Sequence, residues 1–203
     1  MPVLQSKNIS KSSKLGLWHI TETKEYLQKQ ATLFQIDLSN IPQTKSESRI
    51  KQWIATRLLL AHFFSDTSIT YDILGKPHLT NNWNISISHS GDFVAIILNS
   101  NENCRIDIEK ITPKVERIKH KFLNSLDLKT ITTLENLTIY WGAKEALYKY
   151  YGKKEVLFIE NLFIENYLPN SSFFDGVINM PDLKKEIKMT WEKIEDYILV
   201  YTF

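Results

Sequence analysis

The chain has 203 residues, of which 43% are hydrophobic, 12% aromatic and 24% charged. These proportions are typical of a folded globular protein and exclude disordered, collagen-like and low-complexity chains. The net charge of +2 gives no electrostatic reason to expect a nucleic-acid or membrane partner. Cys104 is the single cysteine, so an intrachain disulfide and a cysteine-cluster metal site are both excluded.

The N-terminal residues 1–14 are polar, and we expect them to be flexible. They carry lysines and serines where a signal peptide has an apolar centre. Apolar runs elsewhere fall short of the roughly 20 residues of a membrane-spanning helix. The sequence therefore predicts a cytoplasmic protein.

In the first half, the pattern predicts a strand over residues 15–20 and a helix over 23–34 capped by Thr23. After Asn40-Ile41-Pro42, apolar side chains recur at helical spacing over residues 46–64, with Ser46 as the expected N-cap. Strands are predicted over residues 69–73, 84–88 and 93–98, the first of them ending at a Gly75-Lys76-Pro77 turn.

In the second half, alternation over residues 104–109 predicts a strand, followed by helices near 115–123 and 134–150. The C-terminal region is rich in expected strands, at residues 156–164, 173–180, 187–191 and 197–203. Both halves thus combine helices with mainly antiparallel strands. We predict an α+β fold of two similar halves, residues 15–102 and 103–203.

The first candidate for chemistry is the D-x-E pair Asp107 and Glu109. On a strand these side chains point to the same face, because alternate residues do. Two carboxylates make an oxygen-rich site suited to a hard divalent cation such as Mg²⁺. A solvated acidic strand face is the ordinary alternative.

The second candidate is the helical stripe of Trp141, Glu145 and Lys149, at positions i, i+4 and i+8. Glu followed by Lys four residues later is also an ordinary stabilising helix pair. The aromatic residue on the same stripe favours a face turned into a partly buried cleft.

The third candidate combines the Gly75-Lys76-Pro77 turn with Ser86-Ile87-Ser88-His89-Ser90. Hydroxyls, an imidazole and a lysine ammonium are suitable phosphate donors. A serine hydrolase would need the G-x-S-x-G elbow, and nucleotide binding of the common kinds would need a Walker A or dinucleotide motif; the chain has none of these. A structural loop is the ordinary alternative.

These elements, in this order, resemble the 4′-phosphopantetheinyl transferase superfamily in its pseudodimeric type, which activates peptide and polyketide synthetases. The resemblance runs from about Ser46 to the C-terminus. It implies transfer of the phosphopantetheine arm of coenzyme A to a serine of an apo acyl or peptidyl carrier protein, with release of 3′,5′-ADP. It also implies a monomer whose site lies between its two halves.

By the same resemblance, Asp107, Glu109 and Glu145 would hold Mg²⁺, and Lys149 would lie near the phosphate. Glu145 is the first choice for the base that takes the serine proton, and His89 is the second. The residues expected to contact coenzyme A are Arg57, Lys76, Pro77, Ser88 and His89, with Arg49 as a weaker candidate.

Arg105 departs from the family pattern, which usually has glycine two residues before the first metal aspartate. Its side chain could crowd the phosphate, point away from it, or add a contact to it. Arg105 motivates one alternative function, a catalytically impaired homologue that binds coenzyme A or a carrier protein. Two further alternative functions are a Mg²⁺-dependent phosphohydrolase of nucleotides and a plain interaction domain.

Overall fold

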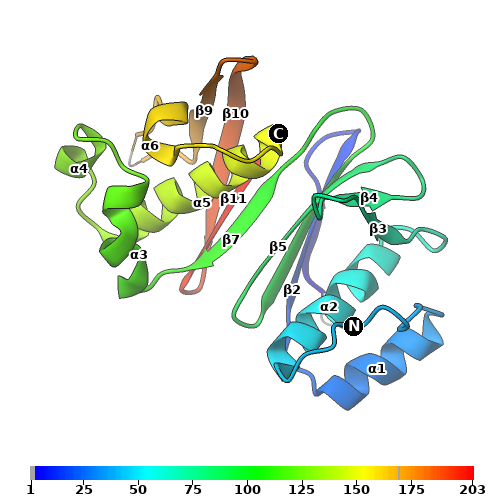
Figure 1. Ribbon diagram of the computed structural model, residues 1–203. Coiled ribbons are helices and arrows are strands. Elements are labelled where there is room, and N and C mark those ends of the chain that lie inside the picture. The colour runs from blue at the N-terminus through cyan, green and yellow to red at the C-terminus, as the bar shows by residue number, and fades with distance from the viewer. Residues whose placement is uncertain (1–2, 169) are drawn as a thin grey trace. The chain divides into compact units, whose positions relative to one another are not determined.

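The computed structural model describes residues 3–168 and 170–203, and the chain divides into two compact units. The units are Met1–Cys104 and Arg105–Phe203, so the division falls two residues after the predicted one. Both contain helices and strands, which confirms the α+β class (Figure 1). That the two units are duplicates of one another stays a prediction.

The N-terminal unit is built on a four-stranded antiparallel sheet of order β1-β2-β6-β5, with a separate two-stranded hairpin β3-β4. The predicted helix caps are confirmed: Thr23 Oγ1 accepts from the Tyr26 amide at 3.2 Å, and Ser46 Oγ from the Arg49 amide at 3.4 Å. The elements are β1 (Val3–Asn8), β2 (Ser13–His19), α1 (Lys24–Leu33), α2 (Glu47–Ala61), β3 (Ile69–Tyr71), β4 (Pro77–Leu79), β5 (Asn84–Ser90) and β6 (Phe93–Asn99).

The core of this unit lies between the two helices and the sheet. Apolar side chains from α1 and α2 pack against alternate residues of β2, β5 and β6, as the period of two in a strand requires. The central members are Trp18, Leu27, Ile54, Leu58, Ile85 and Ile96, none more than 4% exposed.

The expectation that residues 1–14 are flexible is wrong for most of that segment. Val3–Asn8 forms β1, an edge strand whose residues alternate between half-buried and exposed. It pairs antiparallel with β2, from Asn8 opposite Lys14 to Val3 opposite Trp18. Polar side chains are common on the edge strand of a sheet, so a polar composition by itself does not indicate a flexible segment. Residues 1 and 2 lie outside the described residues.

The C-terminal unit has a five-stranded antiparallel sheet of order β7-β11-β10-β9-β8. One long helix, α5, lies on this sheet (Figure 1). The elements are β7 (Ile106–Lys110), α3 (Pro113–Ile118), a 3₁₀ turn (Lys119–Lys121), α4 (Asp127–Thr130), α5 (Leu134–Tyr151), α6 (Phe158–Asn161), β8 (Leu162–Glu165), β9 (Phe173–Met180), β10 (Leu183–Ile194) and β11 (Tyr197–Thr202).

Most of the surface of helix α5 is apolar, and the helix is covered on two sides. Towards the sheet, Ala143 and Leu147 pack against Ile178, Met189 and Val200. The opposite side is covered by α3 and the segment after it, through buried residues that include Val115, Phe122, Leu137 and Tyr140. None of the described helices combines the length and apolar character needed to cross a membrane.

The strand expected over residues 156–164 is replaced in part by a helical turn. Phe158–Asn161 forms α6, and only Leu162–Glu165 continues as β8. The Asn161 side chain accepts a hydrogen bond from the Leu157 amide at 2.9 Å and so closes this turn. The apolar run predicted a strand because a local period of two does not reveal such a side-chain-closed turn.

Candidate active site

The candidate site lies where helix α5 runs beside strand β7. Four helical residues advance about 6 Å and two strand residues about 6.6 Å, so every fourth residue of α5 can face every second residue of β7. Trp141 Nε1 donates to Glu109 Oε1 at 3.1 Å, and Lys149 Nζ donates to Asp107 Oδ1 at 2.7 Å. The predicted helical stripe therefore faces the predicted pair of carboxylates.

Asp107 is buried at 4% exposure and accepts from Lys149. The Lys149 ammonium also donates to the carbonyl of Ile106 at 3.1 Å, which fixes it against the backbone of β7. Gly142 makes room for this carboxylate, because a Cβ there would lie 3.4 Å from Asp107 Oδ2 and 3.3 Å from Val200 Cγ2. A larger side chain at position 142 would press on Val200 of β11 and on Asp107 of β7.

Glu109 and Glu145 are half-buried carboxylates with perturbed acidity. Burial, and next the charge of Asp107, raise the pKa of Glu109 to about 7. The same two causes raise the pKa of Glu145 to about 7, and Lys149 partly offsets them. The three acidic groups thus act on one another electrostatically, and Lys149 balances part of their negative charge.

The donor set fits a hard divalent cation in its chemistry, because three carboxylates supply only oxygen ligands. A cation would also offset both causes of the raised glutamate pKa values, which are burial first and the charge of Asp107 second. Within residues 3–168 and 170–203, however, no three His, Cys, Asp or Glu side chains converge closely enough to ligate one ion. The metal role of Asp107, Glu109 and Glu145 therefore remains a proposal.

Lys144, next to Glu145, is a feature that the sequence analysis missed. Its side chain is fully buried, and its ammonium donates to the carbonyls of Phe122 at 2.5 Å and Phe158 at 2.9 Å. Burial lowers its pKa to about 8. The rings of Phe122 and Phe158 flank Trp141, with centroids 5.1 and 5.8 Å away. Lys144 thus holds the backbone of Phe122 and Phe158, whose rings pack beside Trp141. In the sequence, a lysine among the apolar positions of this helix was the signal that could have indicated this role.

The Arg105 side chain is directed to the C-terminal end of α5. Its Nε donates to the carbonyl of Lys149 at 2.6 Å, and its guanidinium carbon lies 5.8 Å from the centre of the Tyr150 ring. Only 3% of the residue is exposed. The structure therefore directs the Arg105 side chain to the backbone of α5.

Lys76 and Pro77 lie in the N-terminal unit, at the tip of the β3-β4 hairpin. The turn is organised by Asp72, whose Oδ1 accepts from the amides of Leu74 and Lys76, both at 2.9 Å. His78 contacts the other oxygen of Asp72 at 3.1 Å. The sequence analysis did not single out Asp72, although an aspartate opening a Gly-Lys-Pro turn is a recognised turn signal.

Ser88 and His89 are neighbours on β5 and so point to opposite faces of the sheet. Ser88 is buried at 7% exposure, whereas His89 is exposed. The structure therefore does not bring these two predicted coenzyme A contacts to one face.

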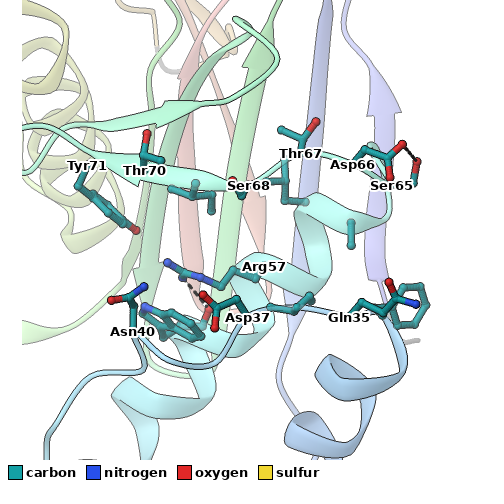
Figure 2. A pocket seen from close by; sticks show the side chains of 16 residues that line it. Gln35, Asp37, Asn40, Arg57, Ser65, Asp66, Thr67, Ser68, Thr70 and Tyr71 are labelled. Carbon is teal, nitrogen blue, oxygen red and sulfur yellow. Dashed lines mark hydrogen bonds between the residues drawn. The ribbon is translucent and has the colours of Figure 1, made fainter.

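Arg57 lies on α2 and lines a pocket of about 810 Å³ within the N-terminal unit (Figure 2). Its guanidinium lies 3.3 Å from the centre of the Trp53 ring and donates to the Trp53 carbonyl at 3.2 Å. Burial lowers its pKa, and the charges of Tyr71 and Asp37 oppose that shift. Arg49, the weaker candidate, is exposed in the first turn of the same helix.

Comparison with known families adds one finding. Residues 106–202 match the family model described as the 4′-phosphopantetheinyl transferase superfamily, a stretch that covers nearly all of the C-terminal unit. It contains Asp107, Glu109, Glu145 and Lys149. No curated protein matches the chain.

Proposed function

Because residues 106–202 belong to the 4′-phosphopantetheinyl transferase superfamily, we propose that the protein is a holo-carrier-protein synthase. It transfers the 4′-phosphopantetheine arm of coenzyme A to a serine of an apo acyl or peptidyl carrier protein and releases 3′,5′-ADP. This proposal rests on the packing of α5 against β7. Asp107 contacts Lys149 there. Glu109 and Glu145 lie close enough for the charges of these two residues to shift the glutamate pKa values.

Asp107, Glu109 and Glu145 would hold a Mg²⁺ ion at this site. When bound, the cation neutralises negative charge on the phosphate oxygens of coenzyme A. Lys149, whose ammonium contacts Asp107 at 2.7 Å, would add a second positive group at the same position.

In the reaction, the serine oxygen attacks the β-phosphorus of coenzyme A in line with the bridging oxygen of the pyrophosphate. The new oxygen–phosphorus bond forms as the bond to the bridging oxygen breaks, and 3′,5′-ADP leaves with that electron pair. Glu145 is the first candidate for the base that takes the serine proton. His89 is the second candidate.

The N-terminal unit would supply the coenzyme A contacts. Lys76 is exposed at a hairpin tip and His89 is exposed near the end of β5, so both are accessible to a phosphate. Arg57, Pro77 and Ser88 complete the proposed set. The predictions of a monomer and of a cytoplasmic location belong to the same proposal.

The alternative of a catalytically impaired homologue was motivated by Arg105. The contact of that side chain with the carbonyl of Lys149 gives it a role without disabling the site. We therefore favour an active transferase.

The deciding experiment measures the intact mass of an apo carrier protein after incubation with this protein, coenzyme A and Mg²⁺. A gain of one phosphopantetheine arm, lost when the metal is chelated, is the expected result. No gain with several acyl and peptidyl carriers contradicts the proposal and favours the binding-only homologue. Release of 3′,5′-ADP without any carrier indicates a phosphohydrolase instead.

A further inference from the structure

Two contacts between β7 and the last turn of α5 are reciprocal. Arg105, just before β7, donates from Nε to the main-chain carbonyl of Lys149 at 2.6 Å. Lys149 in turn donates from its side chain to the carbonyl of Ile106 at 3.1 Å and to Asp107 at 2.7 Å. Each of the two basic residues therefore holds the backbone of the element that carries the other.

The carbonyl that Arg105 holds lies in the last turn of the helix. Helix α5 ends at Gly152, which has a left-handed backbone with φ of 72°. The last carbonyls of a helix have no amide further along to bond, and they carry the negative end of the helix dipole. A buried guanidinium is a strong partner for such a carbonyl, because it provides both a donor and a positive charge.

Arg105 is itself fixed to the sheet. Its amide donates to Thr202 Oγ1 at 2.9 Å, and its carbonyl accepts from the Thr202 amide at 2.9 Å. The guanidinium also lies 5.8 Å from the centre of the Tyr150 ring, whose hydroxyl accepts from Lys185 at 2.8 Å. The anchor of the helix end is thus a residue whose backbone cannot move independently of β11.

From this geometry we infer that Arg105 is a positioning residue for the transferase reaction: it holds the last turn of α5 so that the Lys149 ammonium stays on Asp107. The inference rests on the proposed function, since Lys149 and Asp107 act on phosphate only if the protein is a transferase. Arg105 acts through Lys149 and makes no contact of its own with substrate in this mechanism.

The test is a double-mutant cycle on kcat for carrier modification. Arg105→Ala should lower kcat by roughly tenfold to 100-fold, because small displacements of a positioned group cost that much. Arg105→Lys should restore most of kcat, since an ammonium can also donate to the Lys149 carbonyl. In a Lys149→Met background, Arg105→Ala should change kcat by less than about twofold, because the group it positions is already gone.

Lys185→Met is the matched control. It removes the other cation beside Tyr150 but leaves the Lys149 carbonyl untouched, so kcat should stay within about twofold of wild type. If Arg105→Ala does not fold, Arg105→Gln takes its place in the cycle, because it keeps a neutral N–H donor and loses the charge.

Two kinetic results would overturn the inference: an unchanged kcat in Arg105→Ala, or losses that multiply in the double variant as they do for independent sites. If the wild-type protein transfers nothing, the proposed function fails, and the positional claim is then tested by a crystal structure of Arg105→Ala. Separation of Lys149 Nζ from Asp107 upholds that claim, and an unchanged contact overturns it.

Discussion

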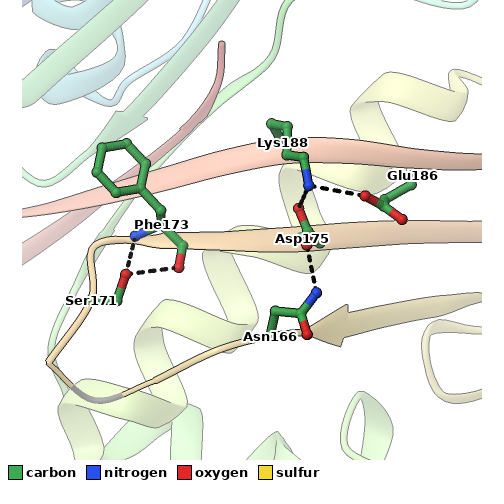
Figure 3. A network of polar contacts seen from close by, with 6 residues as sticks. All are labelled: Asn166, Ser171, Phe173, Asp175, Glu186 and Lys188. Atoms are coloured by element: carbon green, nitrogen blue, oxygen red, sulfur yellow. Dashed lines mark hydrogen bonds and ion pairs between the residues drawn. The ribbon is translucent and has the colours of Figure 1, made fainter.

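The sheet of the C-terminal unit carries a buried aspartate paired with a lysine on each of its two faces, and the two pairs have different surroundings. Asp107 contacts Lys149 at 2.7 Å on the face covered by α5. Asp175, on β9, contacts Lys188 of β10 at 2.6 Å and points away from that helix (Figure 3). Both carboxylates are at least nine-tenths buried, so neither burial nor pairing separates a candidate active site from a structural contact.

The two aspartates differ in the charged and polar groups around them. Asp175 contacts Lys188 and Asn166, whose amide donates to it at 2.7 Å, and these two hydrogen bonds hold its pKa below the ordinary value. Asp107 contacts Lys149 but also lies near two glutamates, whose pKa values are raised to about 7 by burial and next by the charge of Asp107. Carboxylates crowded in this way favour the proposed site at Asp107 over a purely structural role.

The sharpest test of this difference compares conservative variants of the two aspartates. Asp107→Asn and Glu145→Gln should each lower the rate of carrier modification by at least about 100-fold, since each removes a proposed metal ligand. Asp175→Asn should leave the rate within about twofold. The measurement is the initial rate of mass gain of the carrier, and near-normal transfer by the Asp107 variant would remove the metal assignment.

Mg²⁺ should stabilise the protein only while the crowded carboxylates are intact. At a concentration 100 times its dissociation constant, a bound ion adds about 2.7 kcal/mol to the free energy of unfolding. For a chain of this size that raises Tm by roughly 5–10 °C. Thermal unfolding should show this rise for wild type and Asp175→Asn but not for Glu145→Gln. An equal rise in all three proteins would indicate nonspecific binding.

Two glycines at the contact between α5 and the sheet, Gly142 on the helix and Gly176 on β9, allow a second comparison between site and structural positions. A Cβ on Gly176 would lie 2.7 Å from Leu147 and would collide with Met189, so Gly176→Ala should cost about 1–3 kcal/mol of stability by overpacking. Gly142→Ala should cost less stability, because its nearest contacts are 3.3 Å to Val200 and 3.4 Å to Asp107, yet it should lower kcat severalfold because pressure on Val200 shifts the helix that carries Glu145 and Lys149. Denaturant unfolding and carrier modification together separate the two effects, and a Gly142→Ala variant with normal kcat would contradict the close approach.

The smallest expected effect is the pH dependence of the Asp175 contact. Its folded pKa is lowered, so the stabilisation is present above the unfolded value of 3.8 and is lost as pH falls through the folded pKa. Because Lys188 is largely exposed, we expect Asp175→Asn to cost only about 1 kcal/mol at neutral pH. The deficit relative to wild type should shrink on acidification below 3.8, as urea titrations at several pH values would show. A deficit independent of pH would attribute the effect to packing.

Much of the fold follows from local patterns. The caps at Thr23 and Ser46, the apolar run of β6, and the long helix at residues 134–151 are set by interactions within a few residues of one another. The misjudged segments depended on distant partners. Strand β1 exists through its pairing with β2, and the turn α6 is closed by a side chain that hydropathy does not distinguish.

The sequence by itself determined the site's two stripes, because the helical period of 3.6 and the strand period of two place Trp141, Glu145 and Lys149 on one face and Asp107 and Glu109 on another. Only the tertiary structure decided that these faces meet, that Arg105 holds the end of α5, and that Lys144 is buried beside Glu145. Periodicity is a property of neighbouring residues, whereas these contacts join positions 14 to 44 residues apart. Their geometry is set by how closely α5 can approach the sheet.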